Sequence, residues 1–463
     1  MVQPSVVGAA TSLIGIVSII GAFISFGIPL GIQRFLGKNL NNRDELKDYF
    51  SSSFIFMAAL SIIAGLILFL ISIFYLRSSE FSIANSLILF LIMVAGGTTY
   101  SIMLASLFIS TLQTKYLAIA TIASTFIRLG TGVILVYFGF ALTGILEAFL
   151  FAAIGVLLIE FYFVKKILNG FPLRFNFLKL KSVIHAGLAS WIPEFIEIAA
   201  QWLGVIGLYA FIDSTQSGIF FIAMAIMSVI FSIPRSLLDP TLPTLSGMDH
   251  ERKSTISRFI KLSYAITIPI AYITIVYSDV VLSFIGAEYI PGASALIILT
   301  IGALFYPFIT GFTNLVYAYG FYKYVLLLGL SLNVLRIMLY IPLSIQYGIT
   351  GAAFSYTLGF IPAIMVILFI SRKINYNLNI RPILLLITLP IPLLFLSLIL
   401  PWHLGSVSIV FGSIILYTRL QIIKKNEFIS ISESVIPKDI LKIFSVYYKL
   451  ILRLLYGNHP EDN

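Results

Sequence analysis

Two arginines lie near the centres of hydrophobic segments, where a charged side chain is costly. Arg128 and Arg336 are 208 residues apart in similar local sequence. An arginine at the middle of a bilayer costs about 2.5–3.5 kcal/mol on insertion scales, so it usually faces protein or a wet cavity. A guanidinium group binds phosphate oxygens well because its planar fork matches their geometry. We therefore predict that both arginines bind a phosphate headgroup. The alternative is a structural ion pair that holds helices together.

Two carboxylates, Glu194 and Glu197, lie three residues apart in another hydrophobic segment. With Ser190 and Gln201 they form one helical stripe, and Pro193 is expected to kink the helix. They are the expected counterions of the two arginines. Two carboxylates this close could also exchange a proton or bind a cation during transport, so coupling and static neutralisation both stay open.

Prolines and glycines interrupt two predicted helices at corresponding places. The first hydrophobic segment ends in SFGIPLGIQRF and the seventh in SIPRSLLDPTLP. Broken helices are a sequence indicator of a binding site or a moving gate in transporters. Arg34 and Arg235 lie at these ends and are predicted to attract an anionic headgroup. Ordinary anchoring of the helix ends at the membrane surface is the alternative role for both residues.

The composition is that of a protein that crosses a membrane many times. Of 463 residues, 59% are hydrophobic and only 10% charged, more apolar surface than one globular core can bury. The absence of cysteine excludes disulfides, thiolate metal sites and cysteine nucleophiles. The net charge is +10, but the basic residues cluster between apolar segments. This distribution indicates a membrane face rather than nucleic-acid binding.

Thirteen hydrophobic segments are long enough to cross about 30 Å of hydrocarbon. None alternates in polarity as a β-barrel strand would, so the predicted fold is an all-α polytopic bundle. The segments are 6–32, 51–75, 83–109, 117–138, 141–163, 183–211, 218–238, 260–285, 293–319, 324–345, 351–370, 383–400 and 404–423.

The basic residues also predict the orientation. Of 29 cations, 26 fall on one face when the connections alternate, only Arg77 falls on the other, and Arg128 and Arg336 lie within spans. Basic residues are retained in the cytoplasm, so we predict a cytoplasmic C-terminus. Thirteen spans then place the N-terminus outside with no basic flank. We therefore expect that a first helix is missing from this sequence.

An internal repeat follows the two arginines. Lys115-Tyr116 matches Lys323-Tyr324, Gly139 matches Gly348, and Thr143-Gly144 matches Thr350-Gly351. These ordered matches predict two bundles related by an axis along the membrane normal, with a cavity between them. We divide the chain into an N-terminal bundle (1–170), a C-terminal bundle (171–375), two additional transmembrane helices (376–423) and a cytoplasmic amphipathic basic tail (424–463).

Several stretches resemble a known family. They are LSFIGAEYIPGASALIILTIGAL (282–304), the following YGFYKYVLLLGLSLNVLRIMLY and YGITGAAFSYTLGF, and the earlier GIPLGIQRFLGKNLNNRDELKDYF and LDPTLPTLSG. They resemble polysaccharide-biosynthesis flippases, the Wzx-type branch of the MATE-like superfamily that also contains multidrug MATE antiporters and MurJ lipid II flippases. The resemblance implies two six-helix lobes, with the family's first helix absent here and two extra C-terminal helices. It also implies that a lipid-linked oligosaccharide on a polyprenyl phosphate or pyrophosphate crosses from the cytoplasmic to the outer leaflet by alternating access.

Three other functions stay open at the level of sequence. A cation-coupled MATE-type drug exporter would favour an acidic, aromatic cavity, and a lipid II flippase would also use cationic residues. A membrane glycosyltransferase or polymerase would need positioned carboxylates in sizeable aqueous loops, whereas the outer connections here are short. We expect a monomeric, non-enzymatic protein of the plasma membrane. Its expected partners are the lipid-linked oligosaccharide, membrane lipids and H⁺ or Na⁺, with no nucleic acid, metal or cofactor.

Overall fold

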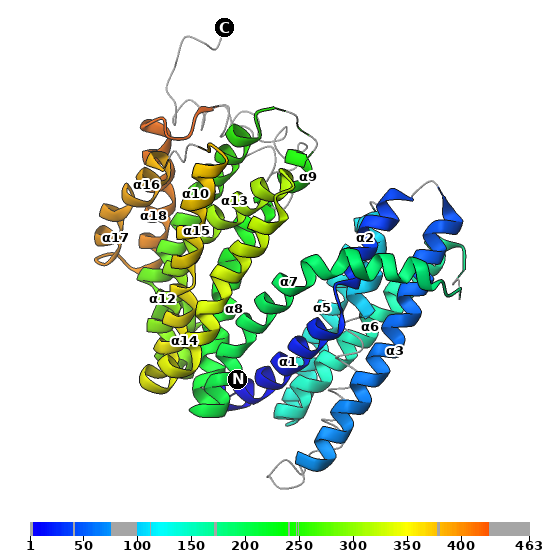
Figure 1. The fold of residues 1–463 in the computed structure, drawn as a ribbon. Helices are drawn as coiled ribbons and strands as arrows, with labels where there is room; N and C mark the ends of the chain where they lie inside the picture. Colours follow the sequence, from blue (N-terminus) through cyan, green and yellow to red (C-terminus); the bar gives the residue numbers. More distant parts are fainter. Residues whose placement is uncertain are drawn as a thin grey trace, which may run out of the picture. The chain divides into compact units, whose positions relative to one another are not determined.

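All regular elements in the described part of the chain are helices, which confirms the predicted all-α class (Figure 1). The computed structural model describes residues 3–39, 42–75, 100–111, 113–170, 174–238, 241–246, 248, 250–376 and 380–425. By their internal contacts the residues form two compact units, Met1–Phe221 (unit 1) and Ile222–Asn463 (unit 2).

Nine helical segments within the described ranges are long and apolar enough to cross a membrane. The chain is therefore a multi-pass membrane protein, as predicted. Shorter apolar helices cover Tyr100–Ser110 and Arg381–Ser397. Most of the predicted span 83–109 and most of the predicted tail 424–463 lie outside the described residues, so the number of crossings stays a prediction.

Unit 1 is built around α7, which packs along α1, α2 and α3, while α5 and α6 pair with each other. Because α7 packs on these helices, it belongs to unit 1, which continues to Phe221, and the bundle boundary at 170/171 stays a prediction. The described helices of unit 1 are the short helix Tyr100–Ser110, α1 (Pro4–Ile24), α2 (Ile28–Lys38), α3 (Arg43–Tyr75), α5 (Thr114–Tyr137), α6 (Ala141–Leu168), α7 (Phe177–Phe211) and the first turns of α8 (Ser214–Leu238).

The predicted break in the first span is present between α1 and α2. Phe26 and Gly27 adopt positive φ values of 45° and 68°, which end α1. From α7, the Trp191 ring stacks on Phe26 at 5.1 Å between centroids, and its indole N–H donates to the Ala22 carbonyl at 3.0 Å. The break is also tightly packed, because a Cβ on Gly187 of α7 would overlap the Gly27 carbonyl. The broken helix is therefore held in place by α7.

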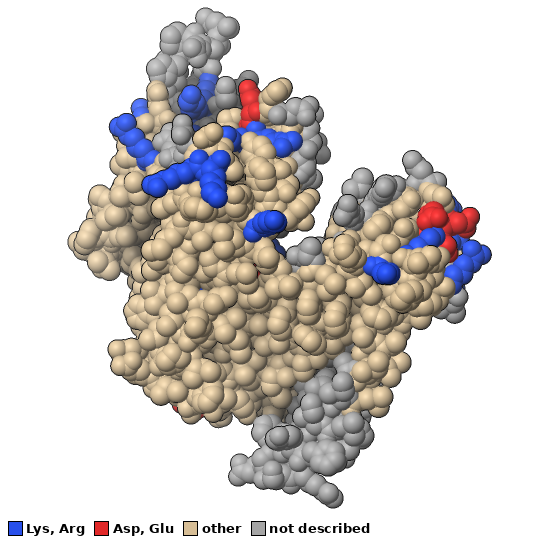
Figure 2. All heavy atoms as spheres, viewed as in Figure 1, with Lys and Arg blue, Asp and Glu red and all other residues tan. Residues whose placement is uncertain are grey.

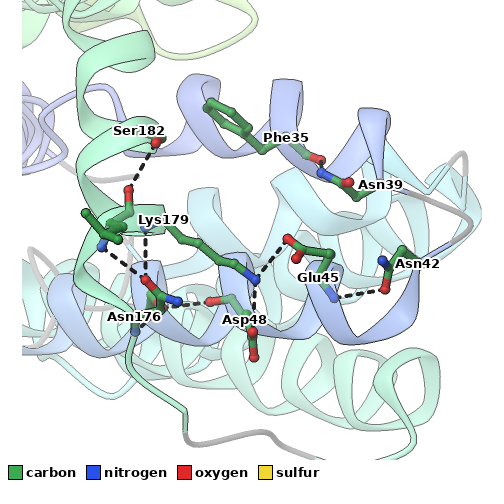
Figure 3. A network of polar contacts seen from close by, with 10 residues as sticks. Phe35, Asn39, Asn42, Glu45, Asp48, Asn176, Lys179 and Ser182 are labelled. Atoms are coloured by element: carbon green, nitrogen blue, oxygen red, sulfur yellow. Dashed lines mark hydrogen bonds and ion pairs between the residues drawn. The ribbon is translucent and has the colours of Figure 1, made fainter.

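A polar network fixes the start of α7 on the first turns of α3 (Figure 3). The Asn176 side chain caps α7 by accepting from the Leu178 and Lys179 amides. The Lys179 ammonium lies 2.9 Å from both Glu45 and Asp48. Burial disfavours this charge, but the hydrogen bonds to the two carboxylates outweigh that cost and raise the pKa of Lys179. The network therefore links α3 and α7 while the lysine is protonated.

Unit 2 is built around α10, which packs against α12, α13, α16 and α18. Its first element is the remainder of α8. The others are α9 (Thr241–Ser246), α10 (Arg252–Val276), α11 (Ser278–Ser283), the 3₁₀ helix η2 (Ala287–Gly292), α12 (Ala293–Ala303), α13 (Tyr306–Ala318), α14 (Tyr322–Leu358), α15 (Phe360–Lys373), α16 (Arg381–Thr388), α17 (Ile391–Ser397) and α18 (Trp402–Arg419).

Tyrosine hydroxyls attach the last helices to α10. Pro390 interrupts the helix between α16 and α17 and, having no N–H, leaves the Leu386 carbonyl without its helical donor. Tyr417 of α18 donates to that carbonyl at 2.8 Å. Tyr272 of α10 donates to the neighbouring Ile387 carbonyl at 2.6 Å. In a membrane these carbonyls have no water to bind, so the tyrosines hold the break and join the helices.

Prediction: the crossing of α1 and α8 in unit 1 depends on two glycines. A Cβ on Gly218 would overlap the Pro4 carbonyl oxygen, and one on Gly8 would overlap the Ser214 carbonyl oxygen. We expect Gly218→Ala to destabilise the protein by about 1–3 kcal/mol, the usual cost of overpacking, measured as a lower Tm in detergent. Gly130→Ala is the control, because nothing lies within 4 Å of its Cβ position. Equal Tm values for both variants would contradict this close approach.

Candidate functional site

Each of the two mid-span arginines belongs to the first arm of a helical hairpin. After α5 the chain turns at Gly139 (φ 92°), and α14 is interrupted at Gly348 (φ 58°). A glycine soon after each turn packs against the end of the first arm. A Cβ on Gly144 would contact Leu135, and a Cβ on Gly351 would overlap the Leu343 carbonyl. Leu135 and Leu343 are again 208 residues apart. The hairpins therefore support the predicted repeat.

Arg128 lies near the middle of α5 on the surface of unit 1. Its side chain is exposed, and the guanidinium carbon lies 5.0 Å from the centre of the Phe149 ring on α6. Such a cation–π contact fixes the guanidinium plane while leaving its N–H groups available. Ser124 and Thr131, on the same face, are half-buried between α5 and α6.

Arg336 occupies the equivalent place in unit 2 but is only 3% exposed. Its guanidinium carbon lies 3.9 Å from the Tyr356 ring centre and 4.4 Å from that of Phe360. Nε donates to the Tyr356 carbonyl at 2.8 Å, and Nη1 donates to the Asn333 side-chain oxygen at 3.2 Å. Gly359 leaves room for the side chain, since a Cβ there would lie 2.6 Å from Nε.

The two arginines thus share one type of contact and differ in exposure. Each stacks on an aromatic residue of the next helix in its own hairpin, 20 or 21 residues later. Among the described residues, neither forms an ion pair with a carboxylate. Arg336 Nη2 and the hydroxyl of buried Tyr340, one turn further along α14, have no hydrogen-bond partner there. A chamber shared by Arg128 and Arg336 stays a prediction, because they belong to separate units.

Glu194 and Glu197 lie on α7 close to the residues that hold the α1–α2 break. Glu194 is half-buried and Glu197 is exposed. No ion pair with Arg128 or Arg336 is present in the described structure, so the counterion role stays a prediction. Trp191, one turn before Glu194, stacks on Phe26 at the break. This proximity of carboxylates and hinge was not foreseen from the sequence.

The two cations at the broken helix ends lie on separate elements. Arg34 lies on α2, and its side chain is outside the described part of the structure. Arg235 is exposed in the last turn of α8, directly after Pro234. The described part of α8 ends at Leu238 and α9 begins at Thr241, with residues 239–240 outside the described structure, so the second interruption stays a prediction. Headgroup attraction by either arginine stays a prediction.

Glu160 lies in the second half of α6. It is fully buried within unit 1. Neither carboxyl oxygen has a partner at strict hydrogen-bond geometry in the described residues, although the Ser101 side chain lies close enough to interact with the carboxylate. Its helical spacing from Ala153, Val164 and Leu168, which are also buried, was the available signal that it faces inward.

Comparison with known proteins places this helical architecture in a family. Residues 11–294 match the family described as "Polysaccharide biosynthesis protein". The chain belongs to this family. The match covers more than half of the chain and includes the Arg128 hairpin and the α1–α2 break. It confirms the resemblance drawn from the sequence motifs. A search of curated protein sequences found no match.

Solved structures show that the family member shares its fold with the MOP superfamily. A lipid II flippase MurJ in an inward closed conformation has a TM-score of 0.64 at 17% identity, covering 91% of this chain and 98% of that chain. An inward-facing multidrug resistance MATE transporter has a TM-score of 0.62 at 15% identity, covering 81% and 91%. A MOP superfamily transporter from Pyrococcus furiosus has a TM-score of 0.52 at 13% identity, covering 80% and 94%.

Prediction: Arg336→Lys destabilises this family member. Lysine lacks the planar group that stacks between Tyr356 and Phe360 and bonds the Tyr356 carbonyl. We expect a loss of about 2 kcal/mol or more from the desolvated cation–π contact alone, seen as a lower Tm. Arg372→Lys, an exposed change on α15, is the control. If both variants melt alike, the stacking is not important for stability.

Prediction: Glu160→Gln keeps or raises the Tm. A neutral amide is less costly than a carboxylate at a buried position where no described residue forms a strict hydrogen bond with the carboxyl oxygens. Glu147→Gln, a half-buried site on the same helix, serves as the comparison. A clear loss of Tm confined to Glu160→Gln would show that the charged carboxylate stabilises unit 1.

Proposed function

We propose that this family member is a flippase for a lipid-linked oligosaccharide. It would carry the glycan on a polyprenyl phosphate or pyrophosphate from the cytoplasmic to the outer leaflet of the plasma membrane by alternating access. Membership of the polysaccharide biosynthesis family supports this function. The fold supports it too, because it is similar to that of a lipid II flippase and of MATE transporters, which move their substrates across membranes.

The observation that carries the proposal is the exposed guanidinium of Arg128 in the middle of a membrane-spanning helix. It has no carboxylate partner in the described residues and is oriented by Phe149. An exposed charge at this depth is costly unless an anion or water meets it. A lipid phosphate supplies such an anion, and its oxygens can accept two parallel N–H donors. We therefore assign the headgroup contact first to Arg128.

Arg336 has a different role in this conformation. Its Nη2 has no hydrogen-bond partner in the described residues, whereas Nε and Nη1 already donate to protein oxygens. A headgroup could therefore bind the whole guanidinium only if the side chain left Tyr356 and Phe360. We assign it to packing of α14 against α15, with substrate contact reserved for a state in which these helices separate. Arg34 and Arg235, at the broken helix ends, would attract the anionic headgroup before it reaches Arg128.

Glu194 and Glu197 are the proposed coupling site for H⁺ or Na⁺. They lie about one and two turns after Trp191, which holds the α1–α2 break through Phe26 and Ala22. A change of charge on this turn of α7 would act on a helix break, the kind of element that moves in transporters. The carboxylates would thereby connect ion binding to movement of α1 and α2.

The basic ends of the helices give the proposed orientation. In unit 2, Lys and Arg gather at the end where α10 begins and α15 ends (Figure 2). Arg252 and Lys253 lie at the first of these positions and Arg372 and Lys373 at the second. Since basic residues stay on the cytoplasmic side, this end and the end of α18 would face the cytoplasm.

Prediction: Arg128→Gln slows flipping of a lipid-linked oligosaccharide in proteoliposomes. Loss of a charged hydrogen bond costs about 1.5–3 kcal/mol, which corresponds to a rate about tenfold lower or more below saturation. Arg128→Lys should recover part of the rate, because it restores the charge without the planar fork. Lys115→Gln, an exposed cation at the start of the same helix, is the matched control.

The choice of substrate in the same assay separates the alternatives. Flipping of polyprenyl-linked glycan but not of lipid II or of a cationic drug supports the proposed function. Transport of the drug alone would identify an exporter, and lipid II alone a lipid II flippase. An unchanged rate in Arg128→Gln, with glycan flipping intact, would remove Arg128 from the site while leaving the flippase assignment standing.

A further inference from the structure

Unit 2 contains a cavity at its basic end that the proposed transport mechanism does not use. Its volume is about 350 Å³, and it lies between the first turns of α10 and the start of α16. Small-molecule sites usually measure about 300–1,000 Å³, so this cavity suits a single headgroup rather than an oligosaccharide. The lining residues are Ser254, Ser257, Arg258, Ile260, Lys261, Phe308, Tyr376, Ile380, Pro382 and Ile383.

One face of α10 supplies the polar wall of the cavity. Ser254, Ser257, Arg258 and Lys261 follow one another at helical spacing, so they lie on the same side of the helix. Arg258 is exposed and Lys261 half-buried, which gives two cations on one wall of a partly enclosed space. None of the described residues that line the cavity is a carboxylate. The wall therefore favours an anion.

The segment after α15 closes the cavity from another side. The Tyr376 hydroxyl lies 2.6 Å from the Ser257 hydroxyl, and Lys253 bonds the Ile374 and Asn375 carbonyls at 2.8 and 3.0 Å. These contacts hold Tyr376 at 7% exposure. Burial raises the pKa of Tyr376, although the bond to Ser257 opposes this, so its hydroxyl stays neutral.

The start of α16 adds a positive helix end and an apolar floor. Ile380, Pro382 and Ile383 form its cap and first turn. The first N–H groups of a helix lack internal partners and carry partial positive charge, which favours a negative group. Ile260, Phe308 and Ile383 provide apolar surface beside these polar groups. The cavity is therefore amphiphilic, with cations and donors on one side and hydrocarbon on the other.

We propose that this cavity binds the headgroup of an anionic phospholipid from the leaflet at the basic end of unit 2. The site lies at the start of α10, a helix long and apolar enough to cross a membrane, and lipid headgroups lie at the ends of such helices. Basic pockets between helices on the cytoplasmic side bind anionic lipid headgroups. The phosphate would contact Arg258, Lys261 and the start of α16, and the upper acyl carbons would contact Phe308 and Ile383. A bound lipid would fill the junction between α10 and the α16–α18 group. The proposal does not depend on which substrate is transported.

The test is retention of phosphatidylglycerol by the purified full-length protein, measured by native mass spectrometry during titration with phosphatidylglycerol or phosphatidylcholine. The double variant R258Q/K261Q should bind phosphatidylglycerol about thirtyfold more weakly, from the attraction that each basic residue has for anionic lipid. Its control is R372Q/K373Q, which removes two exposed cations from the last turn of α15 outside the cavity. Ile383→Trp keeps every charge but fills the cavity, and it should also abolish the retained lipid.

Three results would overturn the proposal. Equal weakening in R372Q/K373Q would indicate general attraction to a basic surface. Equal retention of phosphatidylcholine would show that charge does not select the ligand. Displacement of the lipid by inorganic phosphate, with the same thermal stabilisation, would identify a site for free phosphate. Ile383→Trp and the charge variant change the cavity in different ways, so misfolding of one still leaves the other to decide.

Discussion

A guanidinium group inside a membrane must be shielded by the protein, and in each hairpin an aromatic ring of the second arm stacks on the arginine of the first. Arg336 lies between Tyr356 and Phe360, and its Nε reaches a backbone carbonyl. Gly359 is part of the same arrangement, because any larger residue would enter the space of the arginine. Arg128 keeps only the first of these contacts, with Phe149. The same stacking contact thus occurs in both hairpins, but Arg336 is buried whereas Arg128 is exposed and can contact a ligand.

Close helix packing depends on glycine and on side chains that replace lost backbone bonds. Gly8 and Gly218 let α1 and α8 meet backbone to backbone, and Gly187 does the same for α7 at the α1–α2 break. Where Pro390 interrupts a helix, Tyr417 bonds the carbonyl that is left free. Without water at these depths, each break needs such a partner. The breaks are therefore firmly held features, and movement at any of them would require exchanging these contacts.

The sequence predicted the helical class, the break in the first span and the internal repeat, because hydrophobic length, prolines and glycines act locally. It could not predict that Arg128 is exposed and Arg336 buried, since the sequences around the two arginines are similar. The difference in burial comes from Gly359 and Phe360, which lie after the helix that carries Arg336. The α10–α16 cavity joins residues more than 100 positions apart, which no local pattern reveals.

The short chain distance between each arginine and its ring has a consequence for biosynthesis. Phe149 follows Arg128 by 21 residues and Tyr356 follows Arg336 by 20. Each ring therefore emerges from the ribosome as part of the very next helix, before any later helix has been made. The charge can be shielded as soon as its hairpin closes in the translocon, so each half of the repeat enters the lipid as a self-sufficient pair of helices.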